Sequence, residues 1–157
     1  MSSDFFKTSI LPFAGIIIKI CRAYTHTQED FEDYYQEVCL QIWRSRNRFQ
    51  QQSEWSTWIY RLTLNVCLTL QKKKRIATTP IEGTAAHAAT TSTSNQADID
   101  RLYAAIRQLP EIDRAIILLY LEEKSYKEIA QIIEISASNV GVRINRIKQK
   151  LKKLLDG

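Results

Sequence analysis

The chain has 157 residues, 45% of them hydrophobic and 25% charged, which excludes a disordered tail and leaves room for one ordinary core or two small ones. The formal net charge of +5 permits an anionic partner without requiring one. Cys21, Cys39 and Cys67 are odd in number and widely spaced, and the only histidines are His26 and His87. Disulfide frameworks and zinc sites need paired, clustered residues. The composition therefore predicts reduced, buried cysteines in the cytoplasm, no metal and no cofactor.

The chain begins with an apolar stretch, residues 1–21, that contains Asp4 and is interrupted by Lys19. It is too short and too charged to cross a bilayer. We expect an amphipathic or buried helix there, and no membrane insertion.

Apolar residues at helical spacing predict two longer helices in the first half of the chain. The first set follows a capping pair formed by Thr27 and Asp30 and consists of Phe31, Tyr35, Val38 and Ile42. The second set follows the polar stretch QQQS, precedes the cluster KKKR, and consists of Trp55, Ile59, Leu62 and Val66. No segment of this half has a credible strand pattern.

Residues 76–97 are rich in Thr, Ser and Ala and carry one charge. This composition is typical of a flexible linker. The fold class is therefore predicted as all-α, with one small helical lobe in residues 1–75 and another in residues 98–157.

The second lobe has the pattern of a helix-turn-helix domain. A helix from about residue 98 ends before Pro110, and another runs through IDRAIILLYLEE. Ser125 and Glu128 form a capping box for a short helix that ends near Ile133, and Ser136 caps a last, basic helix. A short helix, a tight turn and a second helix are the elements of this DNA-binding motif.

Charge is distributed unevenly within both lobes. Residues 1–43 and 98–134 each have a net charge of −3, whereas residues 44–75 carry +7 and residues 135–157 carry +5. A basic run is often only a solvated face. The first basic segment, however, is interleaved with Trp55, Trp58 and Tyr60, as single-stranded nucleic acid requires. The second lies on the last helix of the helix-turn-helix pattern, which suits a major groove.

The last helix has a buried side and a free side in its sequence. Val140, Ile144, Ile147 and Leu151 recur at steps of four, three and four and are expected in the core. The opposite side then carries Asn139, Val142, Asn145 and Arg146. Asn145 is the residue best suited to read a base, because an asparagine amide can pair with adenine.

Three segments, FEDYYQEVCLQIW, RFQQQSEWSTWIYRLTLNVCLTLQKKKR and LPEIDRAIILLYLEEKSYKEIAQIIEISASNVGVRINRIKQKL, resemble in that order regions two and four of extracytoplasmic-function sigma factors. The resemblance covers most of the chain outside the linker. It implies a bacterial, cytoplasmic transcription initiation factor that binds core RNA polymerase, recognises promoter DNA, helps to melt it and leaves after initiation. An anti-sigma factor is a further partner that the resemblance suggests.

The resemblance also implies site residues. Asp33, Gln36 and Glu37, which share one helix face, match the motif that docks on the polymerase. The match to the part that holds the minus-ten element comprises Phe49, Ser53, Glu54, Trp55, Arg61, Asn65, Lys72, Lys73, Lys74 and Arg75. The match to the recognition surface for the minus-thirty-five element comprises Ser138, Asn139, Gly141, Val142, Arg143, Asn145, Arg146 and Lys148, with Arg143 and Lys148 expected on phosphates. Trp58, Ile59 and Leu62 are expected in the core, and Trp55 suits either role.

Two positions depart from the family pattern. Glu134 stands where the family usually has Gly in the turn, at a cost of about 0.5 to 1 kcal/mol if the position needs a positive φ. Gly141 stands where a basic residue is frequent, and it has no side chain to read a base.

Two other classes of function remain open on the sequence alone. A stand-alone helix-turn-helix regulator would need only the second lobe, and an interaction-only helical bundle would bind no promoter. An enzyme is not expected, because the sequence has no phosphate-binding glycine loop, no metal cluster and no nucleophile with a base at a recognised spacing.

Overall fold

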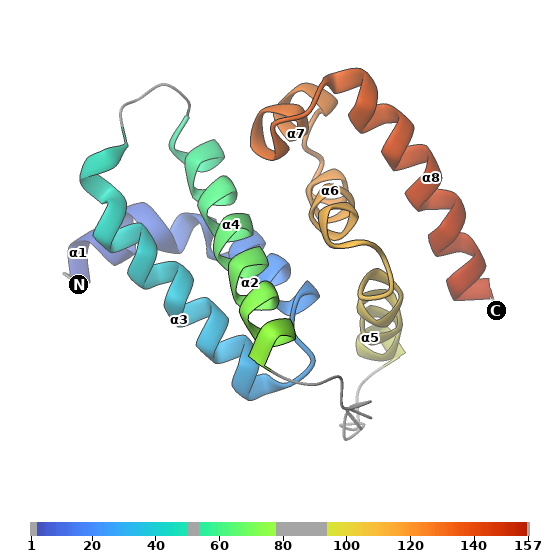
Figure 1. Cartoon of the computed structure of the whole chain (residues 1–157), viewed down its shortest axis with the longest axis horizontal. Helices are drawn as coiled ribbons and strands as arrows, with labels where there is room; N and C mark the ends of the chain where they lie inside the picture. The colour runs from blue at the N-terminus through green and yellow to red at the C-terminus, as the bar shows by residue number, and fades with distance from the viewer. Residues whose placement is uncertain (1–2, 50–53, 78–93, 157) are drawn as a thin grey trace.

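The computed structural model describes residues 3–49, 54–77 and 94–156, and every regular element in these ranges is helical (Figure 1). The first lobe contains α1 (Ser3–Phe5), α2 (Ala14–Ala23), α3 (Gln28–Ser45) and α4 (Trp55–Ala77), with short π and 3-10 turns at Phe6–Ile10, Leu11–Phe13 and Arg46–Arg48. The second lobe contains α5 (Ser94–Ile106), α6 (Glu111–Leu121), α7 (Tyr126–Ile133) and α8 (Ala137–Asp156). The predicted all-α class is confirmed.

The predicted caps are present at three helix starts. The Thr27 hydroxyl accepts a hydrogen bond from the Asp30 backbone N–H at 3.0 Å at the start of α3. Ser125 and Glu128 form the capping box of α7, and the Ser136 hydroxyl accepts from the Asn139 backbone N–H at 3.2 Å. Each cap satisfies a backbone donor that the first helical turn would otherwise leave without a partner.

The helices at the predicted linker extend further than the sequence indicated. Within the range 76–97, α4 reaches Ala77 and α5 begins at Ser94. The side-chain amide of Gln96 donates to Asp100 one turn further on at 3.0 Å, a spacing that supports helix. The remainder of the predicted linker, residues 78–93, lies outside the described residues.

The cysteines are free and buried, as predicted. Cys21 of α2 and Cys67 of α4 face each other with their sulfur atoms 4.0 Å apart. This contact and burial hold the pKa of the Cys67 thiol well above its usual value. Thiolate is the reactive form of cysteine, so these side chains act as small core residues. Within the part of the chain that the structure describes, no helix has both the length and the apolar character needed to cross a membrane.

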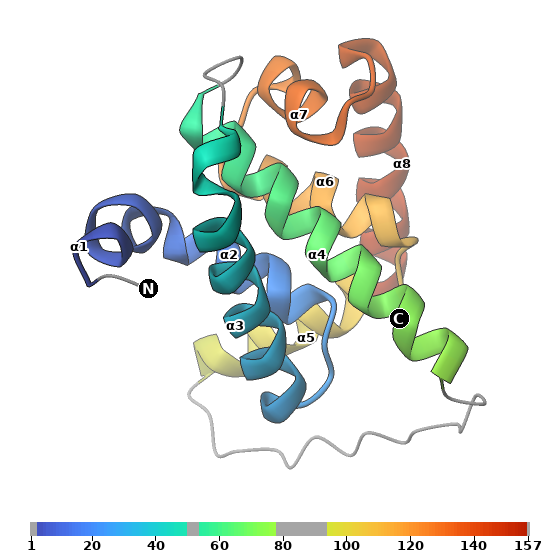
Figure 2. The same ribbon diagram turned by 60° about the vertical axis from the view of Figure 1, so that its left-hand side comes forward.

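The two lobes pack against one another, with α2 and α4 of the first facing α6 and α7 of the second (Figure 2). Buried apolar side chains of both lobes form one continuous core. Polar contacts flank it. The buried Tyr24 hydroxyl donates to the Glu111 carbonyl, and the Arg107 guanidinium donates to the Thr25 carbonyl at 2.8 Å. Each lobe thus completes its small core against the other.

Glu134 ends α7 in the left-handed conformation, with φ 65° and ψ 45°, so the position does need the positive φ that favours glycine. We expect Glu134→Gly to raise the free energy of unfolding by about 0.5 to 1 kcal/mol. The substitution also removes an ion pair to Arg61, but at 4.0 Å and with 74% of the Glu134 side chain exposed that pair contributes little. Urea denaturation measures the change.

Glu123 provides the control, because its φ of 63° is equally left-handed. No ion pair of Glu123 occurs among the described residues. Stabilisation by Glu123→Gly together with destabilisation by Glu134→Gly would contradict the assignment and show that the contact with Arg61 outweighs the backbone strain.

Candidate protein and nucleic-acid interfaces

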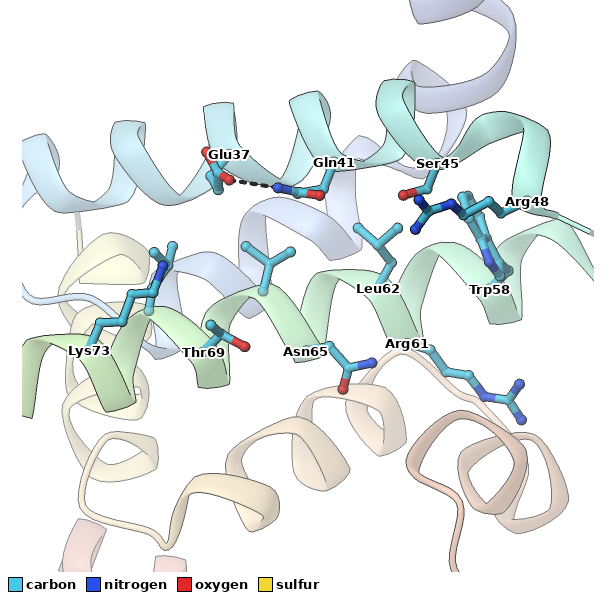
Figure 3. A pocket seen from close by; sticks show the side chains of 12 residues that line it. Glu37, Gln41, Ser45, Arg48, Trp58, Arg61, Leu62, Asn65, Thr69 and Lys73 are labelled. Atoms are coloured by element: carbon cyan, nitrogen blue, oxygen red, sulfur yellow. Dashed lines mark hydrogen bonds between the residues drawn. The ribbon is translucent and has the colours of Figure 1, made fainter.

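A groove runs between α3 and α4 on the outer side of the first lobe (Figure 3). It consists of two cavities of about 530 and 500 Å³ that share Glu37 and Leu70 as lining residues. We call it the α3–α4 groove. Its acidic residues lie on α3, whereas most of its basic residues lie on α4. This follows from the sequence, in which residues 1–43 have a net negative charge and residues 44–75 a net positive charge.

The three predicted polymerase-docking residues lie together at this groove. Asp33 and Gln36 are exposed, and Glu37 is half-buried with its carboxylate accepting from the Gln41 amide at 2.9 Å. All three line the second cavity. They share one face of α3, as the spacing predicted, and a protein that approaches this face would meet a cluster of acceptors.

The basic residues of α4 divide between the groove and the second lobe. Arg61, Asn65 and Lys73 all line the groove, and the guanidinium end of Arg61 points toward α7 (Figure 3). Nε of Arg61 donates to the Gln131 carbonyl at 2.7 Å, and a second guanidinium nitrogen donates to the same oxygen. In this arrangement Arg61 is therefore engaged by the helix-turn-helix lobe.

The cluster at residues 72–75 is also partly engaged. Lys72 and Lys73 are exposed. Lys74 pairs with Asp30 of α3, and Arg75 pairs with Glu111 of α6, each at 2.5 Å. Two of the four predicted DNA-binding cations are thus held by carboxylates of this chain.

An aromatic cluster lies where α4 begins. The ring of Trp55 stacks on Trp58 with centroids 4.8 Å apart, and Phe49 meets the Trp55 ring edge-on at 5.1 Å. The Trp55 indole N–H donates to the Ser9 carbonyl at 2.8 Å. The cluster is half-buried, so its rings are held in place and still partly open to solvent. Glu54 beside it is exposed, and Ser53 lies outside the described residues.

Trp58, Ile59 and Leu62 are expected in the core from the sequence, and Ile59 is fully buried there, whereas Trp58 and Leu62 pack against it only partly buried. Trp58 and Leu62 are half-buried and line the α3–α4 groove. All three lie on the apolar stripe of α4, and Trp58 and Leu62, at its edge, pack against the core while also facing the groove. Arg48 also lines the groove and was not singled out from the sequence, although it lies in the basic segment 44–75.

The two sides of α8 are as predicted. Val140, Ile144 and Ile147 are at most 2% exposed and Leu151 is 8% exposed. Most of the predicted DNA-facing residues are exposed: Ser138, Asn139, Val142, Asn145, Arg146 and Lys148.

Two of the predicted phosphate contacts have partners within the lobe. Arg143 is half-buried and pairs with Asp113 of α6 at 3.0 Å. The Lys148 ammonium lies 4.5 Å from the centre of the Tyr120 ring, and a hydrogen bond to Tyr120 raises the pKa of Lys148. The raised pKa favours the charged ammonium, and the side chain reaches solvent.

Comparison with known protein families matches both lobes. Residues 12–76 match the model of sigma-70 region 2, and residues 99–151 match that of sigma-70 region 4. The extracytoplasmic-function (ECF) RNA polymerase sigma factor SigM of Mycobacterium tuberculosis is 26% identical over 139 residues, which cover 87% of this chain and 70% of the relative. SigW of Bacillus subtilis, also an ECF sigma factor, is 26% identical over 167 residues, covering 97% and 89%.

Solved structures of similar fold span both lobes. The sigma factor RpoE of Bartonella quintana, in complex with the anti-sigma factor NepR, superposes with a TM-score of 0.76 at 20% identity and 96% coverage of both chains. CnrH, in complex with the cytosolic domain of CnrY, superposes with a TM-score of 0.73 at 18% identity, covering 99% of this chain and 90% of CnrH.

The two region matches lie in the order of the two lobes, and the relatives cover both. The chain belongs to the ECF sigma factors, a family of transcription factors rather than of enzymes, whose members bind core RNA polymerase, direct it to specific promoters and help to melt them.

Proposed function

We propose that residues 1–75 carry the polymerase-docking and minus-ten functions, and that residues 98–157 carry the minus-thirty-five function. The main support for polymerase docking is structural: Asp33, Gln36 and Glu37 lie on one face of α3 at the α3–α4 groove. In this proposal these three side chains meet donors on the core polymerase. Charge-assisted hydrogen bonds of this kind fix orientation as well as affinity.

For the minus-ten element, we propose that the melted non-template strand passes along α4. The aromatic cluster of Phe49, Trp55 and Trp58 supplies stacking surfaces for unpaired bases, and Glu54 and its neighbour in the sequence, Ser53, belong to the same proposed site. The strand's phosphates meet the polar and basic residues of α4: Arg61, Asn65, Lys72, Lys73, Lys74 and Arg75. Arg48 is added to this set because it lines the same groove.

For the minus-thirty-five element, we propose that the exposed side of α8 enters the major groove. Ser138, Asn139, Val142 and Asn145 present small or amide side chains near the N-terminal end of the helix, where helix-turn-helix proteins contact base edges. Arg146 and Lys148 serve phosphates. Arg143 joins them only if it leaves Asp113.

These assignments require the two lobes to separate on the polymerase. Arg61 and Arg75 are bound to Gln131 and Glu111 of the second lobe, and these acceptors compete with a DNA phosphate for the same guanidinium groups. We propose that docking on core polymerase exchanges the interlobe contacts for polymerase and DNA contacts.

We further propose that an anti-sigma factor is a partner of the closed arrangement. RpoE and CnrH share this fold over nearly the whole chain, and they were solved in complex with the anti-sigma factor NepR and with the cytosolic domain of CnrY, respectively. We place the chain in the bacterial cytoplasm, where promoter DNA lies, acting without a catalytic site of its own.

The minus-ten assignment predicts a salt effect. Lys72→Gln together with Lys73→Gln should slow open-complex formation and reduce its dependence on salt concentration. The logarithm of the DNA-binding constant falls as the logarithm of the salt concentration rises, and each lost phosphate contact makes this slope shallower by about 0.7 to 0.9. Rates of open-complex formation between low and moderate salt measure the slope.

The matched control is Lys152→Gln together with Lys153→Gln, which removes the same charge from two exposed lysines at the end of α8. An equal reduction of the slope by both double variants would mean that the chain's total charge, rather than the α4 cluster, sets the salt dependence.

A further inference from the structure

Helix α6 contacts two of the cations on α8. Asp113 and Tyr120 are seven residues apart on α6 and therefore lie on one face of that helix. The Asp113 carboxylate pairs with Arg143 at 3.0 Å, and the Tyr120 ring has its centre 4.5 Å from the Lys148 ammonium. The face of α6 that packs against α8 thus holds the side chains of Arg143 and Lys148 in place.

The two contacts differ in the charge that they leave for a DNA phosphate. The Asp113 carboxylate compensates the charge of Arg143, so a phosphate has to displace it. The Tyr120 ring carries no net charge, and it attracts the Lys148 ammonium through its π electrons without neutralising it. A hydrogen bond to Tyr120 also raises the pKa of Lys148, which favours the charged form. Of the two cations, Lys148 is the one whose charge stays uncompensated in this contact.

Tyr120 is fixed by packing on two sides. It is half-buried and packs against the hydrophobic core. The ring of Tyr126, the first residue of α7, lies 6.4 Å from the Tyr120 ring, centre to centre, at a tilt of 43°. Tyr126 in turn rests on α8 at Gly141, where an added Cβ atom would lie 3.3 Å from Cε2 of the ring. The support beneath Lys148 is therefore built from α6, α7 and α8 together.

Lys148 lies at the border between the buried and the exposed side of α8. Buried Ile144 is four residues before it and exposed Asn145 is three residues before it, so both are its neighbours on the helix surface. A lysine at such a border lays its aliphatic stem on the protein while its ammonium reaches solvent. Phosphates line the edges of a DNA groove, beside the base edges that a recognition helix contacts. The position of Lys148 thus suits a phosphate.

We propose that Tyr120 is a positioning residue for promoter binding: it holds the Lys148 ammonium where a backbone phosphate of the upstream element binds. A free lysine side chain has to be ordered when it binds, which lowers affinity by about two- to tenfold. A ring that orders the side chain beforehand removes this cost. The inference rests on the proposed entry of α8 into the major groove, and it makes Lys148, rather than Arg143, the phosphate contact that is already in place.

The experiment uses holoenzyme assembled from core polymerase and the full chain, and it measures dissociation constants for a promoter duplex at several salt concentrations. Tyr120→Leu removes the ring, Tyr120→Phe keeps it, and Lys148→Gln removes the cation. Each Tyr120 variant is also combined with Lys148→Gln. The control combines Tyr120→Leu with Lys150→Gln. Lys150 is exposed, but it follows Lys148 by two residues and therefore points to another side of α8.

We expect Lys148→Gln to weaken binding and to make its salt dependence shallower by about one unit. Tyr120→Leu should weaken binding by about two- to tenfold and leave the salt dependence unchanged, because the cation is still present and only less ordered. Tyr120→Leu should have no further effect when Lys148→Gln is present, and its full effect when Lys150→Gln is present. Tyr120→Phe should stay within about twofold of wild type, since the ring remains.

Equal weakening by Tyr120→Leu with and without Lys148→Gln would overturn the proposal, because Tyr120 would then support the lobe in general. Wild-type affinity of a folded Tyr120→Leu variant, with its fold confirmed by circular dichroism, would also overturn it. In both cases a weakening by Lys148→Gln alone would leave the proposed phosphate contact standing. If Lys148→Gln is itself silent, that contact fails and the proposal fails with it. Tyr120→Met repeats the measurements should Tyr120→Leu fold poorly.

Discussion

Asp33→Arg together with Glu37→Arg should weaken binding to core RNA polymerase about a hundredfold or more while leaving the chain folded. Both residues lie on one face of α3 at the α3–α4 groove. Reversing their charges replaces acceptors by cations where the polymerase is proposed to present donors. Breaking charge-assisted contacts within an interface costs about 2 to 5 kcal/mol. Neither residue belongs to the buried core, and surface changes away from it seldom unfold a protein.

The measurement is a binding titration of labelled chain with core polymerase, with circular dichroism to confirm the fold. Glu32→Arg is the control for Asp33→Arg alone. The two residues are adjacent and exposed on α3, but Glu32 does not line either cavity of the groove. Equal effects of the two single reversals, or wild-type affinity of the folded double variant, would place the docking surface elsewhere.

Asn145→Ala and Lys148→Ala should have different kinds of effect on the upstream promoter element. Asn145 is exposed on the groove-facing side of α8, and an amide paired with adenine contributes about 1 to 3 kcal/mol of discrimination. Its loss should cut the preference for adenine at one position about tenfold. Lys148 is proposed to serve a phosphate, so Lys148→Ala should weaken binding to all sequences alike and lower the salt slope by about one unit.

Selection of bound sequences by holoenzyme from a library randomised in the upstream element measures both effects. An unchanged preference with Asn145→Ala, combined with an altered preference with Lys148→Ala, would contradict the assignment of the two sides of α8.

The local features of this fold could be predicted because they depend on residues close in the chain. The caps by Thr27, Ser125 and Ser136 each join residues three apart, and such short patterns occur in the sequence itself. The buried side of α8 follows equally from the spacing of its apolar residues.

Features that depend on contacts between distant segments could not be predicted. Arg61 binds a backbone carbonyl of residue 131, and a carbonyl acceptor has no side-chain signature in the sequence. Trp58 and Leu62 have the spacing of core residues, but their exposure depends on how closely α3 packs beside α4. The packing of Tyr126 on Gly141 has the same origin, since it joins the start of one helix to the face of another.

The closed arrangement of the two lobes is the main feature that the sequence did not indicate. The side chains of Tyr24, Arg61, Arg75 and Arg107 form hydrogen bonds or ion pairs between the lobes. The sequence around each of these residues does not indicate its partner in the other lobe. Burial lowers the pKa of the Arg107 guanidinium, yet it stays charged at neutral pH and bonded to backbone carbonyls. These four contacts are polar, but the lobes also share one apolar core, so separation on the polymerase requires new partners for both.

Transcription reconstituted from purified core RNA polymerase, this chain and a library of promoter DNAs tests the proposed function most directly. We expect transcripts from a subset of promoters that share an upstream and a downstream element, and we expect the chain alone to bind these DNAs far more weakly than the holoenzyme does. Tight, selective promoter binding by the chain alone, with no transcript started when core polymerase is added, would contradict the proposed function.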